Sequence, residues 1–264
     1  MIKKLLIFLL VLVLAAPVIA PTEPLLGELP DWSKFPQPVG LWLFNEGSGN
    51  KVYDLSGNGN YGTLTNNAAW SVGTKGRCIK FNSNDDYVLL NRKISYGVGG
   101  IWTIVFWANK RAAGGGSDGI VCGELGTADN YIFLYTGNYL RYVNTATDMQ
   151  QWTELTDFTG WHQYAIAADN NTEKLYRDGV YIAAGSIDSS MEIDVIGAGY
   201  SNSGYDLDGK VFLFMIFDFA LSASEIAQLY RDPFPWFKRV PIWMYKSLAA
   251  PPAAVGQVIT VTMQ

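Results

Sequence analysis

Residues 40–90 read GLWLFNEGSGNKVYDLSGNGNYGTLTNNAAWSVGTKGRCIKFNSNDDYVLL, and this stretch decides the fold class. Short apolar or aromatic runs alternate in it with clusters of Gly, Asn, Ser and Asp. This pattern is typical of short strands joined by tight turns, and it leaves little room for a helix. The same rhythm continues to about residue 221, so the sequence predicts an all-β domain.

The composition fits one β-rich domain with a sizeable core. The chain has 264 residues, of which 49% are hydrophobic, and it contains 27 glycines for turns. Its formal net charge is -5, and no basic run interrupts the sequence. A nucleic-acid partner is therefore not expected, because such partners require clustered Lys and Arg.

Residues 1–20 have the features of an export signal: Lys3 and Lys4, an apolar core over residues 5–16, and a small-residue cleavage pattern ending at Ala20. Pro21 follows, and proline is unfavourable just after a cleaved bond, so the alternative is a retained N-terminal anchor. Either reading predicts a secreted or cell-surface protein, and membrane contact is expected only through an uncleaved N-terminal segment.

The remaining chain divides into three parts. Residues 21–38 hold five prolines and predict an extended linker, and residues 39–232 predict the domain. Residues 233–264 form an aromatic and proline-rich tail that ends in an alternating, strand-like segment. The tail is interpreted as a strap over an apolar edge, or else as a membrane or partner contact. The terminal strand adds to the protein's own sheet or allows self-association with another subunit.

Within the domain, turn signals and apolar alternation predict the strands. Gly137-Asn138 and Asp178-Gly179 predict hairpins, and Ser222 with Glu225 predicts the capped start of one short helix. Cys78 and Cys122 lie in strand-like contexts and form either a disulfide or two buried thiols. The predicted strands cover residues 39–45, 78–81, 87–90, 102–109, 119–124, 131–136, 139–144, 162–169, 172–177, 180–185 and 210–217.

An ordered series of blocks carries a resemblance to a known family. The blocks are WLFNEGSG at 42–49, DLSGNGNYGTL at 54–64, GRCIKF at 76–81, DDYV at 85–88, WTIVFW at 102–107, WHQYA at 161–165, LYRDG at 175–179, DGKV at 208–211 and ALSASEI at 220–226. Over residues 40–230 the series resembles a laminin G-like domain of the concanavalin A-like lectin/glucanase superfamily. The resemblance implies a two-sheet antiparallel jelly-roll sandwich. It also implies a binding role toward glycans or proteins.

The resemblance further implies one structural calcium ion near the DLSGNGN turn. Asp54 matches that motif, and Asn45 and Glu46 lie close in sequence, so these three are the candidate ligands. However, Phe212-Leu213 stand where the closing strand of relatives commonly carries carboxylates, and calcium prefers about six to eight oxygens. The alternative is that Asp54 accepts backbone N–H bonds within its own turn.

No catalytic residues are predicted. The segment that begins with Glu192 and Asp194 starts like the catalytic strand of glycosidases in this superfamily. Strand alternation places these two side chains on one face, about 6.6 Å apart. Gly197 stands where the acid/base carboxylate is expected, so the segment is interpreted as an ordinary strand leading to Ile196-Gly197. His162, the sole histidine, is interpreted as a core or rim residue because no nucleophile motif accompanies it.

The leading hypothesis is an exported, non-catalytic module that binds carbohydrate or a cell-surface protein. The loop 199–206 combines tyrosines with small polar residues, and its candidate ligand-binding residues are Tyr200, Asn202, Tyr205 and Asp206. Further turn-placed aromatic candidates are Trp70, Tyr96, Tyr139 and Trp152. One alternative is a structural subunit of a virion, pilus or surface array, which the tail motivates; a glycoside hydrolase is the third hypothesis.

Overall fold

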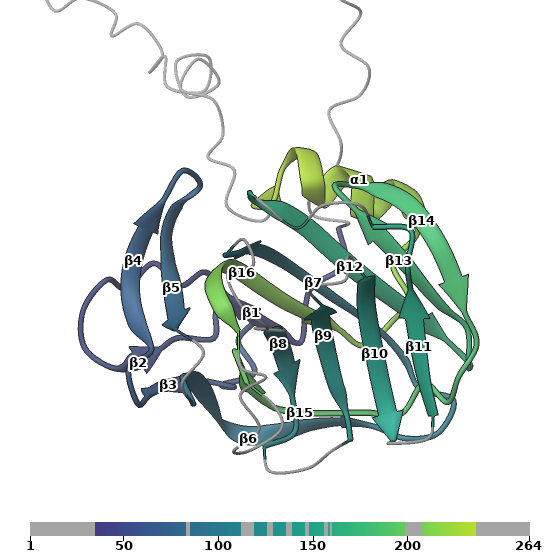
Figure 1. Ribbon diagram of the computed structural model, residues 1–264, viewed down its shortest axis with the longest axis horizontal. Coiled ribbons are helices and arrows are strands. Elements are labelled where there is room, and N and C mark those ends of the chain that lie inside the picture. Colours follow the sequence, from purple (N-terminus) through teal and green to yellow (C-terminus); the bar gives the residue numbers. More distant parts are fainter. Residues whose placement is uncertain are drawn as a thin grey trace, which may run out of the picture. The chain divides into compact units, whose positions relative to one another are not determined.

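The computed structural model describes residues 35–82, 85–111, 119–125, 129–135, 139–145, 148–155, 158, 160–198 and 207–235. These residues form sixteen β-strands and one α-helix, and the strands pair into two antiparallel sheets of eight (Figure 1). The predicted jelly-roll sandwich with one short C-terminal helix is therefore confirmed. No helix among these residues is long and apolar enough to cross a membrane.

Sheet A has the strand order β14-β13-β12-β7-β16-β5-β4, with β1 paired to β16. Its strands are β1 (Gly40–Trp42), β4 (Ala69–Gly73), β5 (Gly76–Asn82), β7 (Ile101–Lys110), β12 (His162–Asp169), β13 (Glu173–Arg177), β14 (Val180–Gly185) and β16 (Asp208–Phe217). Sheet B has the order β11-β10-β9-β8-β15-β6-β3-β2. Its strands are β2 (Lys51–Val52), β3 (Gly62–Thr65), β6 (Tyr87–Tyr96), β8 (Gly119–Gly123), β9 (Tyr131–Tyr135), β10 (Tyr139–Thr145), β11 (Asp148–Trp152) and β15 (Met191–Ile196).

The main core lies between the two sheets. Sheet A contributes Trp42, Trp102 and Phe106 to it, and sheet B contributes Tyr142 and Ile193, all of them fully buried. Burying such large apolar side chains is the dominant favourable term in folding. The alternation of each strand therefore fixes which of its residues face the core and which face outward.

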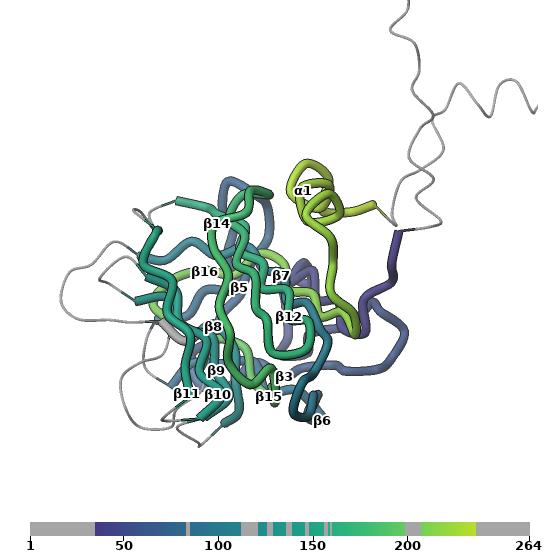
Figure 2. The backbone as a smooth tube through the Cα atoms, turned by 90° about the vertical axis from the view of Figure 1, so that its right-hand side faces the viewer, coloured from purple at the N-terminus to yellow at the C-terminus, as the bar shows by residue number. Residues whose placement is uncertain are grey.

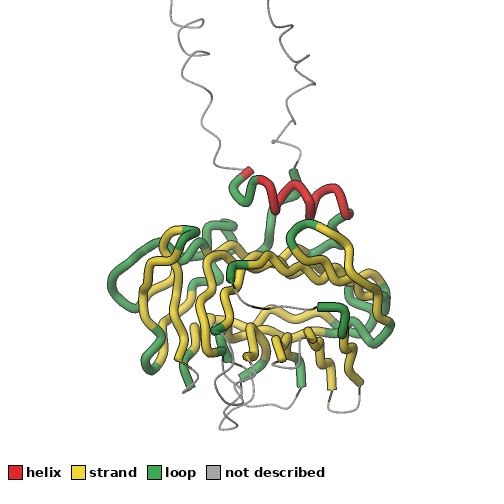
Figure 3. Tube along the Cα trace, turned by 45° about the horizontal axis from the view of Figure 1, so that its top comes forward, coloured by secondary structure: helices red, strands yellow, loops and turns green. Residues whose placement is uncertain are grey.

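A second apolar cluster covers the other face of sheet A. The helix α1 (Ala223–Arg231) packs Ile226 and Leu229 against this face, together with Trp107. Figures 2 and 3 show α1 on the far side of sheet A from sheet B. The predicted helix start is confirmed, because the Ser222 side chain accepts from the Glu225 backbone N–H and the Glu225 carboxylate accepts from the Ser222 backbone N–H.

The described ends of the chain also pack on this second cluster. Phe35, near the end of the predicted linker, is only 6% exposed, and the Phe234 ring lies 5.9 Å from that of Phe212. Residues 1–34 and 236–264 lie outside the described residues. The predictions of a signal or anchor, of a strap and of a terminal strand therefore stay predictions.

The strands that flank both predicted turns pair antiparallel, with Gly137-Asn138 itself outside the described residues, and both cysteines are thiols. Tyr135 pairs with Tyr139 across the first hairpin, and Asp178 and Gly179 have φ values of 52° and 77°, as a two-residue turn between twisted strands requires. Cys78 belongs to the second cluster and Cys122 to the main core, and both are free and buried. Burial raises the pKa of each thiol, which keeps both protonated.

A buried polar network anchors the loop that precedes β15. The Glu173 carboxylate is fully buried, and it accepts a hydrogen bond from the Ser189 hydroxyl and another from the Ile187 N–H at 3.1 Å. The Trp102 indole N–H donates to the Ser189 carbonyl at 2.7 Å. Burial raises the pKa of Glu173, and these two hydrogen bonds offset only part of that effect.

We expect Glu173 to make the stability of the fold fall as the pH rises. A Glu carboxyl whose folded pKa lies above its unfolded value of about 4.3 holds its proton more tightly in the native state. The contribution of Glu173 to the free energy of unfolding is therefore fully present below its unfolded pKa and is lost as the pH rises through its folded pKa. Urea unfolding from pH 4 to pH 8 should show wild type losing stability relative to Glu173→Gln, which carries no titrating group. A constant difference between the two proteins would contradict this.

Candidate functional site

The candidate site lies on the outer face of sheet B, which is the face turned away from the core. On β9, Ile132 and Leu134 are fully buried between the sheets. Successive side chains of a strand point to opposite faces, so Tyr131, Phe133 and Tyr135 lie on the outer face.

Aromatic rings form a continuous row along this face, from β9 onto β10. The ring centroids are 6.0 Å apart for Tyr131 and Phe133, and 5.6 Å apart for Phe133 and Tyr135. Tyr135 and Tyr139 are register partners, and their rings stack at 4.3 Å with planes 14° apart. Phe133 is buried, whereas the three tyrosines are partly exposed. We call these four residues the aromatic row.

Arg141 of β10 holds the end of the aromatic row. Its guanidinium lies 5.3 Å from the centroid of the Tyr139 ring, within the range of a cation–π contact. Its Nη2 donates to Gln151 Oε1 at 2.8 Å and to the Tyr139 hydroxyl at 3.3 Å. The ring of Tyr139 is thereby fixed on two sides, by the Tyr135 ring and by the guanidinium.

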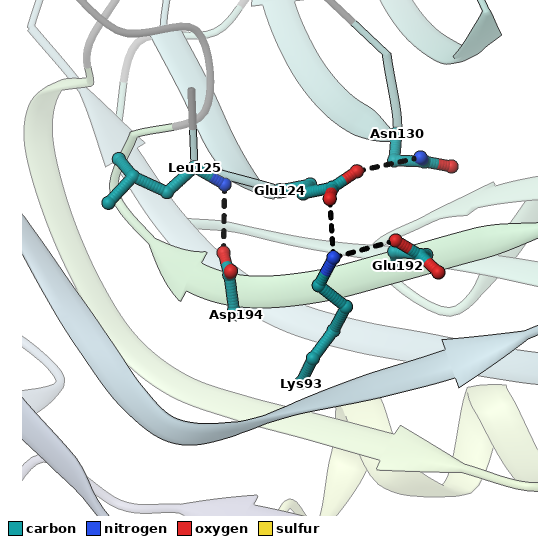
Figure 4. Close-up of polar contacts among 6 residues, drawn as sticks. All are labelled: Lys93, Glu124, Leu125, Asn130, Glu192 and Asp194. Atoms are coloured by element: carbon teal, nitrogen blue, oxygen red, sulfur yellow. Dashed lines mark hydrogen bonds and ion pairs between the residues drawn. The ribbon is translucent and has the colours of Figure 1, made fainter. Parts of the chain in front are cut away.

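A group of charged and amide side chains adjoins the row on the same sheet, and we call it the polar cluster: Lys93, Glu124, Asn130, Glu192 and Asp194 (Figure 4). Lys93 Nζ donates to Glu124 and to Glu192 Oε2, the latter at 2.8 Å. Asn130 Nδ2 donates to Glu124 Oε2 at 3.1 Å, and Asp194 Oδ1 accepts the Leu125 N–H at 2.8 Å. Because Asn130 directly precedes Tyr131, the polar cluster and the aromatic row meet there.

An irregularity in β6 brings Lys93 into the cluster. Ile94 pairs with Ile193 and Leu89 pairs with Val195, so residues 90–93 all lie opposite the single residue Asp194. Extra residues of this kind bend a strand and redirect its side chains. The resulting position lets one ammonium reach carboxylates on two other segments of the sheet, with Glu124 following β8 and Glu192 on β15.

The ion pairs keep the cluster charged. The hydrogen bonds with Glu124 and then Glu192 raise the pKa of Lys93 above its ordinary value. Partial burial opposes ionisation of Glu124, but the hydrogen bonds from Lys93 and Asn130 outweigh it and lower its pKa. A glycosidase acid needs the opposite shift, since it must hold a proton near neutral pH. The cluster is therefore better suited to fixed hydrogen bonding than to proton transfer.

The position after β15 has no room for a carboxylate. Gly197 has a backbone φ of 98°, a conformation that residues with a side chain rarely adopt. A Cβ at this position would lie 2.3 Å from the Phe81 ring. The expected acid/base position is therefore occupied by a glycine that the local packing requires.

The predicted calcium ligands lie in the segment that follows β1. Asp54 Oδ1 accepts the Leu41 and Ser56 N–H groups at 3.0 and 2.9 Å. Its Oδ2 accepts the Ser56 hydroxyl and the Asn60 N–H, both at 2.8 Å. Four donors thus use the acceptor positions of the carboxylate, as the turn-bonding alternative expects.

The other two predicted ligands make separate contacts. Glu46 Oε1 accepts the Tyr53 N–H at 2.7 Å, and no hydrogen bond within the described part of the chain joins Asn45 or Glu46 to Asp54. Nor do the described residues hold a group of three or more His, Cys, Asp and Glu side chains placed to bind a metal ion. These residues do not fit a calcium ion without losing the bonds of Asp54, so the geometry favours the turn-bonding alternative over the predicted calcium site.

We expect calcium to leave the melting temperature unchanged relative to EDTA-treated protein, because coordination by Asp54 would displace donors that already stabilise the turn. Differential scanning calorimetry with and without calcium checks this. Asp54→Ala is the matched variant, and it should lose about 1–3 kcal/mol of stability in either condition through its unpaired donors. A calcium-dependent rise that Asp54→Ala abolishes would instead establish the metal site.

The structure separates the other aromatic candidates. Tyr139 belongs to the aromatic row, whereas Trp152 is buried in the core at 1% exposure. Tyr96 packs on the core beside Trp102, and the Trp70 indole N–H donates to the Gly49 carbonyl at 2.7 Å. The loop candidates Tyr200, Asn202, Tyr205 and Asp206 lie outside the described residues, so their role stays a prediction.

His162 is a rim residue with a local role, as predicted. Its Nδ1 lies 2.7 Å from Asp178 Oδ2, and Arg177 Nη2 lies 2.8 Å from its Nε2. The guanidinium can only donate, so Nε2 accepts from Arg177 and Nδ1–H donates to Asp178. This arrangement braces the β13–β14 hairpin against β12.

Comparisons with known proteins agree with this architecture. Residues 82–227 match the family model described as the concanavalin A-like lectin/glucanases superfamily, which spans more than half of the chain. No curated protein matches the chain.

Several solved structures share the fold. The binding domain of Paraclostridial Mosquitocidal Protein 1 is 19% identical with a TM-score of 0.57, over 75% of this chain and 52% of that chain. Domain 4 of AbnA, a GH43 extracellular arabinanase from Geobacillus stearothermophilus, was solved with arabinotriose. It is 16% identical with a TM-score of 0.56, over 74% of this chain and 98% of that chain. Trypanosoma rangeli sialidase, solved with sialic acid, is 15% identical with a TM-score of 0.53, over 72% of this chain and 32% of that chain. The chain thus spans about half the length of the mosquitocidal binding domain, and at these identities the likeness concerns the fold alone.

Proposed function

The chain belongs to the concanavalin A-like lectin/glucanase superfamily, and we propose that it is an exported, non-catalytic module that binds carbohydrate on the outer face of sheet B. The observation that carries this proposal is the aromatic row with the polar cluster at its end. Sugar rings offer an apolar face and a rim of hydroxyls, so they need a flat aromatic surface and fixed hydrogen-bonding groups side by side.

The geometry of the row supports a role in binding. The partly exposed rings of Tyr135 and Tyr139 are already stacked and braced by Arg141, so a ligand need not order them. Such preorganisation lowers the entropic cost of binding. At the other end of the row, beside Tyr131, Glu124 and Glu192 supply acceptors for sugar hydroxyls, while Lys93 and Asn130 supply donors. Tyr131 and Tyr135 are about 13 Å apart along the strand, so the ligand that uses both ends is an oligosaccharide.

Two features support a non-catalytic role. Lys93 lowers the pKa of Glu124, which disfavours a proton-donating acid, and Gly197 occupies the position where superfamily glycosidases carry a carboxylate. The likeness to an AbnA domain solved with arabinotriose and belonging to an extracellular enzyme is consistent with an exported saccharide binder. The features of residues 1–20 support a secreted or cell-surface location.

A glycan array tests this proposal. We expect selective binding to a set of saccharides by the wild-type chain and its loss in the double variant Tyr135→Ala/Tyr139→Ala. The double variant Tyr200→Ala/Tyr205→Ala serves as the comparison that tests the loop 199–206. Incubation with each bound saccharide should release no new reducing ends. Equal binding by wild type and the sheet variant, or release of product, would contradict the proposal.

A further inference from the structure

A second polar surface lies on the outer face of sheet A, on the other side of the sandwich. Lys210 of β16 is the register partner of Lys80 on β5 and of Asn109 on β7. The alternate residues Ile79 and Val211 face the core, so this row of three polar side chains faces outward. Three adjacent strands therefore present two ammonium groups and an amide side by side.

A hollow of about 220 Å³ opens over this row, and the residues that form its polar lining are Lys80, Asn109, Arg111, Asp208 and Lys210. Arg111 Nη2 lies 2.6 Å from Asp208 Oδ2, so one of the three cations is paired within the hollow. The Lys210 ammonium donates to the Val72 carbonyl at 3.3 Å, a neutral partner. Among the described residues, no hydrogen bond or ion pair engages the Lys80 ammonium.

The charge of the hollow differs in sign from that of the chain. Three cations and one carboxylate line it, whereas the chain has a formal net charge of -5. Like charges placed opposite each other on neighbouring strands destabilise a sheet. An anion seated between Lys80 and Lys210 would remove that repulsion and accept charge-assisted hydrogen bonds from both ammonium groups. The Asn109 amide and the Arg111 guanidinium add further donors at the margin.

We propose that this hollow binds the carboxylate or sulfate group of an acidic saccharide, separately from the outer face of sheet B. That the hollow binds an anion follows from its charge and geometry alone. That the anion is part of a saccharide rests on the proposed function. The hollow has the size of a single small group rather than of a long chain. Each of its three strands is paired on both sides in sheet A, so the donors stand on a rigid base.

Isothermal titration calorimetry with the full chain tests this site, using sodium sulfate, glucuronate and neutral glucose as probes. We expect sulfate and glucuronate to bind with an affinity that falls as sodium chloride is added, and glucose not to bind here. Lys80→Gln/Lys210→Gln should weaken the affinity about tenfold or more, because each charge-assisted bond is strong. Lys174→Gln on β13 is the matched control, an exposed lysine away from the hollow, and it should leave binding unchanged.

The outcomes separate the parts of the proposal. Equal binding of sulfate by wild type and the double lysine variant, or no binding of sulfate or glucuronate at all, would overturn the site. If glucuronate binds no more tightly than sulfate, the claim that the anion belongs to a saccharide is overturned. Melting of the ligand-free proteins is an independent readout: Lys80→Gln should melt above wild type, and a melting temperature at or below that of wild type would contradict the repulsion between Lys80 and Lys210. Failure here would leave binding at the aromatic row unaffected, because Tyr135→Ala/Tyr139→Ala does not touch this hollow.

Discussion

Replacing Trp102 with alanine is expected to lower the free energy of unfolding by about 3–5 kcal/mol. The indole is fully buried in the main core, and its ring meets Tyr142 edge-on at 5.5 Å. Its N–H also satisfies the Ser189 carbonyl, which the variant would leave without that donor. Since domains of this kind are stable by about 5–15 kcal/mol, the variant should be close to the limit of folding. Urea unfolding followed by far-ultraviolet circular dichroism measures the change.

Trp70→Ala is the matched control, because Trp70 lies on the edge strand β4 and is only partly buried. We expect it to cost clearly less than Trp102→Ala. Trp102→Phe should fall between the two, since it keeps an aromatic ring but loses the hydrogen bond. Similar losses at both tryptophans would contradict the assignment of Trp102 to the centre of the sandwich.

Tyr139→Ala is expected to weaken saccharide binding roughly tenfold or more, which corresponds to about 1.4 kcal/mol. The change removes one platform of the aromatic row and also releases the Tyr135 ring and the Arg141 guanidinium from their contacts. Tyr139→Phe keeps the ring and loses the hydroxyl bond from Arg141, so it should retain most of the affinity. Calorimetric titration with the best array ligand measures both constants.

A matched control separates binding from a general loss of stability. Tyr230 is 41% exposed and belongs to α1, the helix on the side of sheet A that faces away from sheet B (Figure 3). Tyr230→Ala should therefore leave the affinity unchanged. If Tyr139→Ala binds as tightly as wild type while Tyr230→Ala does not, the binding surface lies on the helix side instead.

Local sequence signals predicted most of the fold because each acts over a few residues. Asp178-Gly179 specified a two-residue turn, and Ser222 with Glu225 specified the helix start. The strands β2, β3, β4 and β11 were missed. β2, β4 and β11 are edge strands of their sheets. Edge strands expose more of their side chains, so their sequences lack the apolar alternation that predicts a strand. β11, for example, reads DMQQW and buries Trp152 alone.

The site was less accessible to sequence than the fold. The outward tyrosines of β9 were visible as a period of two in Tyr-Ile-Phe-Leu-Tyr, which could have identified the aromatic row. The polar cluster could not have been found in this way, because Lys93 and Glu192 are 99 residues apart in sequence. They meet only because the strand order places β15 between β8 and β6, and because β6 is irregular opposite Asp194.

A crystal structure of the chain with the best array saccharide tests the central claim most directly. The account predicts an intact oligosaccharide with one ring against Tyr135 and Tyr139 and another at the Tyr131 end of the row, where its hydroxyls are bonded to groups of the polar cluster. A saccharide seated on the loop 199–206 or on α1, with the aromatic row empty, would contradict it, as would a cleaved saccharide between Glu124 and Glu192.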